Sequence, residues 1–288
     1  MKTLHLLDGS AFVYRSFYAL PELKTSKGFP TNAVYGFMKA LLSIVKKERP
    51  RYLAVAFDAP ARTRRALIYE RYKARRPKAP DPLKAQIPVV KELIRLAGVP
   101  VLEEPGYEAD DLIASAAKRA LEEGFLVRVH TPDKDLLQLV TDGLTVVNPF
   151  TGEVFTRGRV EEKFGVPPER LTDYLALTGD KTDDVPGLKG VGPKKALELL
   201  KRFGRVEEML KRFDELRRLV PSASREELEL SYELVKLDYG APVPPPEGLE
   251  VKKARLDELV KRLEELEMKS LVKEVRLVFR TAGQGSLF

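Results

Sequence analysis

The sequence predicts an α/β protein in which a mostly parallel central sheet is flanked by helices and is followed by a helical C-terminal region. Two observations support this fold class. Over the first half of the chain, short apolar runs alternate with helical patterns, as they do where parallel strands are joined by helices. From about residue 165 onward, helical patterns predominate.

Three short apolar runs have the pattern of buried parallel strands, because each is bounded by turn residues. They are "TLHLLD" at 3–8, "YLAVAFD" at 52–58 and "FLVRVHTPD" at 125–133. Each run ends in an aspartate, namely Asp8, Asp58 and Asp133. The carboxyl ends of parallel strands share one edge of a sheet, so we expect these side chains to converge. A single aspartate there would be interpreted as a turn cap, whereas three favour a site.

Helical patterns fill the spaces between these runs, at residues 33–48, 82–98 and 108–124. Strands that alternate with helices imply a sheet covered on both faces. Further helical patterns follow in "PERLTDYLALTG", "GPKKALELLKRF", "REELELSYELVKL" and "ARLDELVKRLEELEMKSLVKEV". The last is preceded by a proline-rich segment at 241–248, which we expect to be a semi-rigid surface connector.

The composition excludes several kinds of site. The 288 residues include no cysteine and two histidines, so any metal must be held mainly by oxygen. No apolar stretch approaches membrane-spanning length and no signal peptide pattern is present, so we expect a soluble, cytoplasmic protein. Lys and Arg number 50 against 43 Asp and Glu, and this net charge of +7 suits a polyanionic partner.

The stretch "GYEADD" at 106–111 crowds three acids into the first turn of a helix. The helix dipole favours an acid there by about 0.3 to 1 kcal/mol, which explains one or two acids but not three that repel one another. With two later clusters and the strand ends, the candidate metal ligands are Asp8, Asp58, Glu108, Asp110, Asp111, Asp133, Asp135, Asp180 and Asp183. Such oxygen ligands suit two or more Mg²⁺ or Mn²⁺ ions, which can activate water and stabilise a leaving oxygen.

A basic segment with interleaved tyrosines follows Asp58 directly. Its candidate nucleic-acid contacts are Arg62, Arg64, Arg65, Arg71, Lys73, Arg75 and Arg76. A run of charge is usually a solvated face, but this one would stand over the acidic crevice, where a phosphate backbone needs compensating charge. Lys73 and Arg76, one helical turn apart, could both face a scissile phosphate.

The stretch "GLKGVGPKKA" at 187–196 predicts a second contact with DNA. Gly190 and Gly192 let backbone amides approach a phosphate, and Lys194 and Lys195 lie at the start of the next helix. Between two helices this frame indicates a helix-hairpin-helix, which contacts the DNA backbone without reading sequence. A monovalent cation is a further candidate ligand of this hairpin. A turn within a core is the alternative, but it would not need the two lysines.

These stretches resemble the 5′-nuclease family of 5′→3′ exonucleases and flap endonucleases, particularly the 5′-nuclease domain of bacterial DNA polymerase I. The matching segments, in the family's order, are "LLDGSAFVYRSFYAL", "TNAVYGFMKAL", "VAFDAPARTRR", "YKARRP", "GYEADDLIA", "DKDLLQLV" and "GDKTDDVPGLKGVGPKKA". Asp184 stands where the family usually has Asn. The resemblance implies a PIN-like or resolvase-like fold.

The resemblance also implies roles for individual residues. The acids from Asp8 to Asp111 fall on the family's first metal group, and those from Asp133 to Asp183 fall on its second. Lys73 and Arg76 match the basic pair of the arch under which a single-stranded 5′ end passes. Tyr14 matches an aromatic residue beside the cleaved nucleotide, where stacking on a base is expected.

We therefore expect three parts: an α/β nuclease domain at 1–165 with an arch at about 62–90, a helical DNA-binding region at 166–280 with the helix-hairpin-helix at about 185–203, and a flexible tail at 281–288. In the tail, Gln284, Leu287 and Phe288 resemble a peptide that docks on the sliding clamp.

The expected function is that of a stand-alone, monomeric 5′-nuclease of replication and repair, associated with the nucleoid, that removes DNA flaps or RNA primers. The alternatives are a non-catalytic DNA-junction binding protein and a related metal-dependent ribonuclease.

Overall fold

The computed structural model describes residues 2–280, and at its centre is a six-stranded sheet with the order β3-β2-β1-β4-β5-β6. The strands are β1 (Thr3–Asp8), β2 (Tyr52–Ala56), β3 (Val101–Leu102), β4 (Leu126–His130), β5 (Leu144–Val147) and β6 (Val154–Phe155). All neighbouring strands pair in parallel except β6, which is antiparallel to β5. The prediction of a mostly parallel sheet flanked by helices is therefore confirmed.

The side chains of β1 show why the sheet is covered on both faces. Leu4 and Leu6 enter one hydrophobic cluster, whereas Leu7 enters the other. All three are fully buried. Successive residues of a strand point to opposite faces, so an apolar strand of this kind needs a helix layer on each side.

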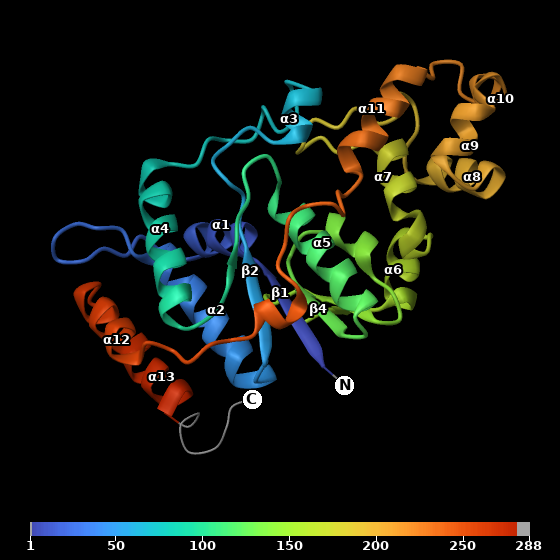
Figure 1. The fold of residues 1–288 in the computed structure, drawn as a ribbon. Coiled ribbons are helices and arrows are strands. Elements are labelled where there is room, and N and C mark those ends of the chain that lie inside the picture. The colour runs from blue at the N-terminus through green and yellow to red at the C-terminus, as the bar shows by residue number, and fades with distance from the viewer. Residues whose placement is uncertain (1, 281–288) are drawn as a thin grey trace.

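Helices from both ends of the chain cover one face of the sheet (Figure 1). They are α1 (Gly9–Ala19), α2 (Asn32–Glu48), α4 (Asp81–Leu96), α12 (Leu256–Glu265) and α13 (Lys269–Arg280). The short helix α3 (Arg64–Ile68) lies above the carboxyl ends of the strands, where the sequence predicts the arch. Residues 69–77 are turns rather than helix, so Lys73 and Arg76 are not on a common helix face.

The opposite face packs on α5 (Ala109–Glu122), and its hydrophobic cluster continues without a break into the later helices. These are α6 (Arg157–Phe164), α7 (Leu171–Thr178), α8 (Pro193–Phe203), α9 (Val206–Lys211), α10 (Phe213–Leu219) and α11 (Arg225–Val235). Short 3-10 segments lie between β4 and β5 at η1 (Asp135–Leu139), between α6 and α7 at η2 (Pro168–Arg170), and between α11 and α12 at η3 (Pro246–Leu249).

The predicted helical region 166–280 is divided in space. Helices α7 to α11 form one group, whereas α12 and α13 pack against α2 and α4 on the far side of the sheet (Figure 1). The proline-rich connector between them runs along α5, where the backbone carbonyl of Val243 accepts a hydrogen bond from Arg119. Within residues 2–280 no helix has the length and apolar character needed to span a membrane.

Candidate active site

The three strand-end aspartates converge, as the sequence predicts. Asp8, Asp58 and Asp133 line one cavity of about 480 Å³ together with Asp110 from the first turn of α5. A larger cavity of about 580 Å³ opens at the opposite edge of the sheet, but Glu48 is the only carboxylate that lines it. The acidic cavity at the carboxyl ends of the strands is therefore the better candidate for chemistry.

Asp8 is buried at the end of β1 and also caps α1. It therefore serves both as a cap and as one of the converging acids. Its carboxylate accepts hydrogen bonds from the backbone N–H of Ala11 at 3.0 Å and from the Thr131 hydroxyl at 2.8 Å. Burial, with added repulsion from Asp133 and Asp58, raises the pKa of Asp8 to about 7. A nearby cation would compensate this charge.

The first turn of α5 is positioned by contacts with the strand ends. Asp58 accepts a hydrogen bond from the backbone N–H of Ala109 at 2.8 Å. Asp110 then faces the cavity, where burial and the charges of Asp133 and Asp8 raise its pKa well above the usual range. Glu108 lies in a different environment from Asp110. Burial would also raise the pKa of Glu108, but the charges of Lys73 and Arg65 outweigh burial and lower that pKa.

A second group of acids lies beside the first. Glu108, Asp110, Asp135 and Asp183 line a small cavity of about 20 Å³. One carboxylate oxygen of Asp135 is buried without a hydrogen-bond partner. Burial and the charge of Asp133 raise the pKa of Asp135 to about 7. An unsatisfied buried oxygen of this kind is costly, which suits a position that holds a cation.

Basic side chains from the turns after α3 reach this acidic layer. The Lys73 ammonium contacts Glu108 at 2.7 Å, and Nε of Arg76 donates to Asp183 at 2.7 Å. Lys73 has a positive φ of 56°, and its backbone N–H donates to the Asp183 carbonyl at 3.0 Å. Both cationic side chains also line the 480 Å³ cavity, as expected for residues that would face a phosphate.

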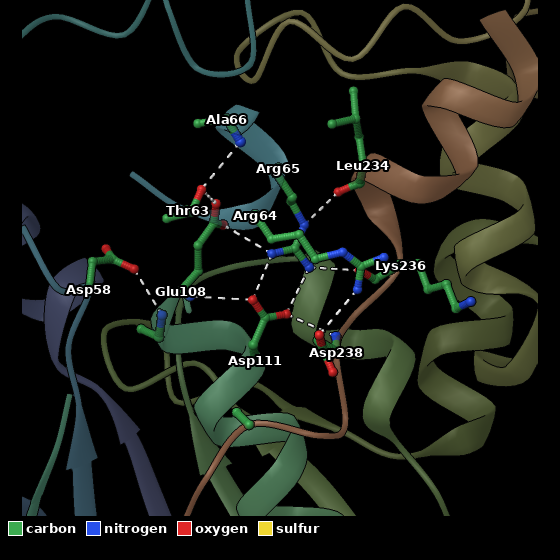
Figure 2. A network of polar contacts seen from close by, with 12 residues as sticks. Asp58, Thr63, Arg64, Arg65, Ala66, Glu108, Asp111, Leu234, Lys236 and Asp238 are labelled. Carbon is green, nitrogen blue, oxygen red and sulfur yellow. Dashed lines mark hydrogen bonds and ion pairs between the residues drawn. The ribbon is translucent and has the colours of Figure 1, made fainter. Parts of the chain in front are cut away.

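Asp111 and Arg65 are paired with each other and do not line the 480 Å³ acidic cavity (Figure 2). The Arg65 guanidinium donates to both Asp111 oxygens, at 2.7 and 2.8 Å. Arg65 is only 6% exposed, so the structure does not fit its predicted contact with DNA. The planar guanidinium matches a carboxylate in two parallel hydrogen bonds, which favours this buried pair over a solvated arginine.

The other predicted DNA contacts lie on the surface. Arg64 pairs with Glu233 at 3.0 Å and Arg75 with Asp184 at 2.9 Å, while the side chains of Arg62 and Arg71 are exposed. Asp184 has a φ of 56°, a left-handed conformation that Asn and Asp adopt more readily than most residues. None of these four arginines lines the acidic cavity itself, whose basic side chains are Lys73 and Arg76.

The hairpin predicted at 187–196 joins α7 to α8. Gly190 has a φ of 82°, which explains glycine there, and α8 begins at Pro193. Lys194 is exposed and Lys195 is half-buried beside Glu198. The backbone and the lysines are thus placed where the sequence predicts them.

Two exposed aromatic residues line the 480 Å³ acidic cavity. Tyr14 is 39% exposed and Tyr18 is 64% exposed, and both side chains come from α1. The sequence interpretation identified Tyr14 but missed Tyr18, although a spacing of four places the two on one helix face. Ser10 was also missed; its hydroxyl accepts a hydrogen bond from the backbone N–H of Asp58 at 3.0 Å.

Across residues 2–280, no three Asp, Glu or His side chains converge closely enough to surround an ion. Three of the predicted ligands are paired with cationic side chains, since Lys73, Arg76 and Lys134 contact Glu108, Asp183 and Asp180 respectively. The donor set nevertheless fits a hard divalent cation, since it consists of carboxylate oxygens and includes the unpaired oxygen of Asp135.

The predicted tail residues Gln284, Leu287 and Phe288 lie outside the described residues.

Two family models match the chain. The 5′-3′ exonuclease N-terminal resolvase-like domain matches residues 3–165, and the 5′-3′ exonuclease C-terminal SAM fold matches residues 166–257. A 5′-3′ exonuclease of Aquifex aeolicus is 58% identical over 289 residues, with 100% of both chains covered. The thermostable DNA polymerase I of Thermus thermophilus is 43% identical over 265 residues, which cover 90% of this chain and 32% of the polymerase.

Solved structures show the same fold at low identity. The bacteriophage T5 flap endonuclease, in a complex with DNA and metal ions, has a TM-score of 0.67 at 20% identity and covers 98% of this chain and 100% of that one. The resolvase-like match agrees with the fold class expected from the sequence. The convergence of the acids, the two domain matches and the Aquifex relative together show that the chain belongs to the 5′-3′ exonuclease family of nucleases.

Proposed function

We propose that this chain is a structure-specific 5′-nuclease that hydrolyses phosphodiester bonds in DNA flaps or RNA primers during replication and repair. The observation that carries the proposal is the cavity at the carboxyl ends of the strands. Asp8, Asp58, Asp110 and Asp133 line it together with Lys73, and Arg76 and Tyr14 complete its wall. Membership of the exonuclease family and the likeness to a flap endonuclease support the same reaction.

Divalent cations would be held by the carboxylates of this cavity and by those of the second group of acids beside it. The first set of ligands is Asp8, Asp58, Asp110 and Asp133, and the second is Glu108, Asp135, Asp180 and Asp183. When bound, Mg²⁺ or Mn²⁺ supplies water activation and stabilisation of the leaving oxygen. The T5 relative was solved with metal ions, which supports this requirement. Asp111 contributes by holding the first turn of α5 rather than as a direct ligand.

The remaining side chains bind and orient the substrate. Lys73 and Arg76 contact oxygens of the scissile phosphate, where they stabilise charge that develops during cleavage. Tyr14 and Tyr18 stack on the base beside the cleaved bond. The hairpin at 187–196 holds duplex DNA through backbone N–H groups and Lys194, aided by a monovalent cation.

Further parts of the proposal concern the setting of the reaction. The enzyme acts as a monomer on nucleoid DNA, and the tail docks on the sliding clamp through Leu287 and Phe288. The exposed arginines at 62–75 attract the polyanion, so DNA affinity should fall steeply as salt rises.

Cleavage of a labelled 5′-flap duplex with and without Mg²⁺ tests the proposal, using Asp58→Asn as the site variant. Asp58 is exposed to the cavity, so the change removes a charge without opening the core. We expect cleavage to fall by about a thousandfold or more while flap binding persists, because the electrostatic stabilisation of the transition state is lost. Asp142→Asn, an exposed acid far from the cavity, is the matched control and should cut normally.

Several results would contradict the proposal. Flap binding without Mg²⁺-dependent cleavage by the unmodified protein would favour the junction-binding alternative. Cleavage of RNA flaps alone, with DNA flaps left intact, would favour the ribonuclease. Equal rates for Asp58→Asn and Asp142→Asn would show that the acidic cavity is not the active site.

A further inference from the structure

Arg65 is a buried cation that joins three separate parts of the chain (Figure 2). Its two terminal nitrogens donate to Asp111 on α5, as described above. Nε of Arg65 also donates to the backbone carbonyl of Leu234 at 2.9 Å, and Nη2 to that of Lys236 at 2.6 Å. All three guanidinium nitrogens therefore have partners within the protein. The same guanidinium lies 3.5 Å from Glu108 at the small acidic cavity. Burying a charge is costly unless it is paired and hydrogen-bonded, and here every nitrogen is.

Asp111 extends this connection through its remaining hydrogen bonds. It accepts from the backbone N–H of Asp238 at 2.9 Å and from that of Glu108 at 3.3 Å. The Ser115 hydroxyl adds a bond to the Asp238 carbonyl at 3.2 Å. The first turns of α5, which present Glu108 and Asp110 to the cavities, are thus fixed to the chain that leaves α11.

The C-terminal half of α11 also contacts the segment that is proposed to bind DNA. The Ser231 hydroxyl accepts a hydrogen bond from the backbone N–H of Gly187 at 2.9 Å, and Ser231 is fully buried. Gly187 is the first residue of the hairpin segment 187–196. A continuous set of polar contacts therefore runs from this segment through α11 and Arg65 to the acids of α5.

We propose that Arg65 is a positioning residue that couples the binding of duplex DNA at the hairpin to the alignment of Glu108 and Asp110. A shift of α11 moves the carbonyls of Leu234 and Lys236, and the rigid guanidinium carries Asp111 with them. A lysine has a single nitrogen and cannot span two carbonyls and two carboxylate oxygens. The inference rests on the proposed function, because it assigns the hairpin to DNA and the acids to catalysis.

The test compares Arg65→Gln and Arg65→Lys with Arg119→Gln. Arg119 also lies on the path between α5 and the C-terminal segment, but it is half-exposed and remote from both cavities. Three quantities are measured: the single-turnover cleavage rate at saturating 5′-flap DNA with Mg²⁺, the flap dissociation constant in EDTA, and hydrogen exchange at residues 108–112 with and without the flap.

For Arg65→Gln we expect a cleavage rate at least about a hundredfold lower, because small misplacements of catalytic groups have effects of that size. The dissociation constant should change by less than about threefold. Flap binding should slow exchange at 108–112 in the unmodified protein and in Arg119→Gln, but not in Arg65→Gln. Arg65→Lys should fall between, since it restores the charge without the full set of hydrogen bonds.

Two outcomes would overturn the inference. A tenfold weaker dissociation constant with an unchanged saturated rate would make Arg65 a DNA contact, and flap-induced protection that persists in Arg65→Gln would show that it does not couple the two sites. If Arg65→Gln does not fold, Arg65→Lys is judged by the same criteria. If the unmodified protein does not cut the flap, the proposed function fails, whereas the exchange experiment, which needs only binding, still decides the coupling.

Discussion

Burial and neighbouring carboxylates raise the pKa of Asp8 and Asp135 to about 7, whereas the net shift of Asp180 is in the opposite direction. Burial alone would also raise the pKa of Asp180, but its contact with Lys134 at 2.6 Å lowers it. The acids of the cavity therefore include some with a cationic partner and some without one. A divalent cation would stabilise the second kind most, because their charge is otherwise uncompensated.

Two buried histidines give the protein a distinct pH response. His5 and His130 are stacked, with Nδ1 of His5 3.1 Å from Nε2 of His130. Burial lowers the pKa of His5 to about 4 and that of His130 to about 3. Histidines of the unfolded chain bind protons below a pKa of about 6.5, whereas the buried histidines of the folded protein stay neutral until the pH is much lower. Because the unfolded state then binds more protons, the free energy of unfolding falls as pH drops from about 6.5 toward 4.

The prediction is a loss on the order of 2 to 4 kcal/mol for the histidine pair between pH 7 and pH 5, at 1.36 kcal/mol per pKa unit. Urea unfolding at a series of pH values measures it. Carboxylates with raised pKa values change stability with pH in the opposite direction. The informative quantity is therefore the difference in pH dependence between the unmodified protein and His130→Gln, which lacks one titrating group. An identical pH dependence in the two proteins would refute the assignment.

At the scale of elements, the loop that carries Asp180 and Asp183 depends on two glycines in close contact. A Cβ on Gly187 would lie 2.6 Å from the backbone nitrogen of Gly179, and φ of Gly187 is 69°. The two ends of the loop therefore meet where no side chain fits, beside the antiparallel bridge between Asp180 and Val185. This contact fixes the position of Asp180 and Asp183 relative to the hairpin.

We predict that Gly187→Ala destabilises the protein by clearly more than Gly152→Ala. Gly152 has a φ of 75° but open space around it, so alanine there measures the conformational cost alone, about 1 to 2 kcal/mol. Flap cleavage should also fall in Gly187→Ala, because the added methyl group would displace the loop that carries Asp180 and Asp183. Melting temperatures and cleavage rates of the two variants check this, and equal behaviour would argue against the packing role.

The sequence predicts those elements whose patterns are long and periodic. The runs ending in Asp8, Asp58 and Asp133 are apolar strands with polar ends, so both the parallel sheet and the convergence of these acids could be anticipated. Strands β3 and β6 are too short for any periodic signal. The pair of Arg65 and Asp111 was also missed, because basic and acidic residues distant in sequence give no sign of which partners they choose.

At the scale of the whole molecule, the position of α12 and α13 illustrates the limit of pattern reasoning. Their amphipathic sequences show that one face is buried but not which surface covers it. The structure places this face on α2 and α4, with Leu271 and Val275 fully buried, and not beside the hairpin. These two helices therefore contribute to stability on the side of the sheet away from α7 to α11.

Substitution of Leu271 distinguishes this arrangement from the predicted DNA-binding region that included α13. Leu271→Ala should lower stability by about 2 to 5 kcal/mol, as is usual when a large buried side chain is truncated. Flap affinity at a temperature where the variant remains folded should match that of the unmodified protein. Unfolding experiments measure the stability, and a binding titration measures the flap affinity. Weaker flap binding by the folded variant would indicate that α13 belongs to the DNA interface.

The central claim is that the acids at the carboxyl ends of the strands form a divalent-metal site for phosphodiester hydrolysis. Anomalous diffraction from crystals soaked in Mn²⁺ tests it most directly. The account predicts Mn²⁺ peaks bounded by Asp8, Asp110 and Asp133, with Glu108 and Asp135 nearby. Saturating Mn²⁺ with no peak in this cavity, or peaks only elsewhere on the surface, would contradict it.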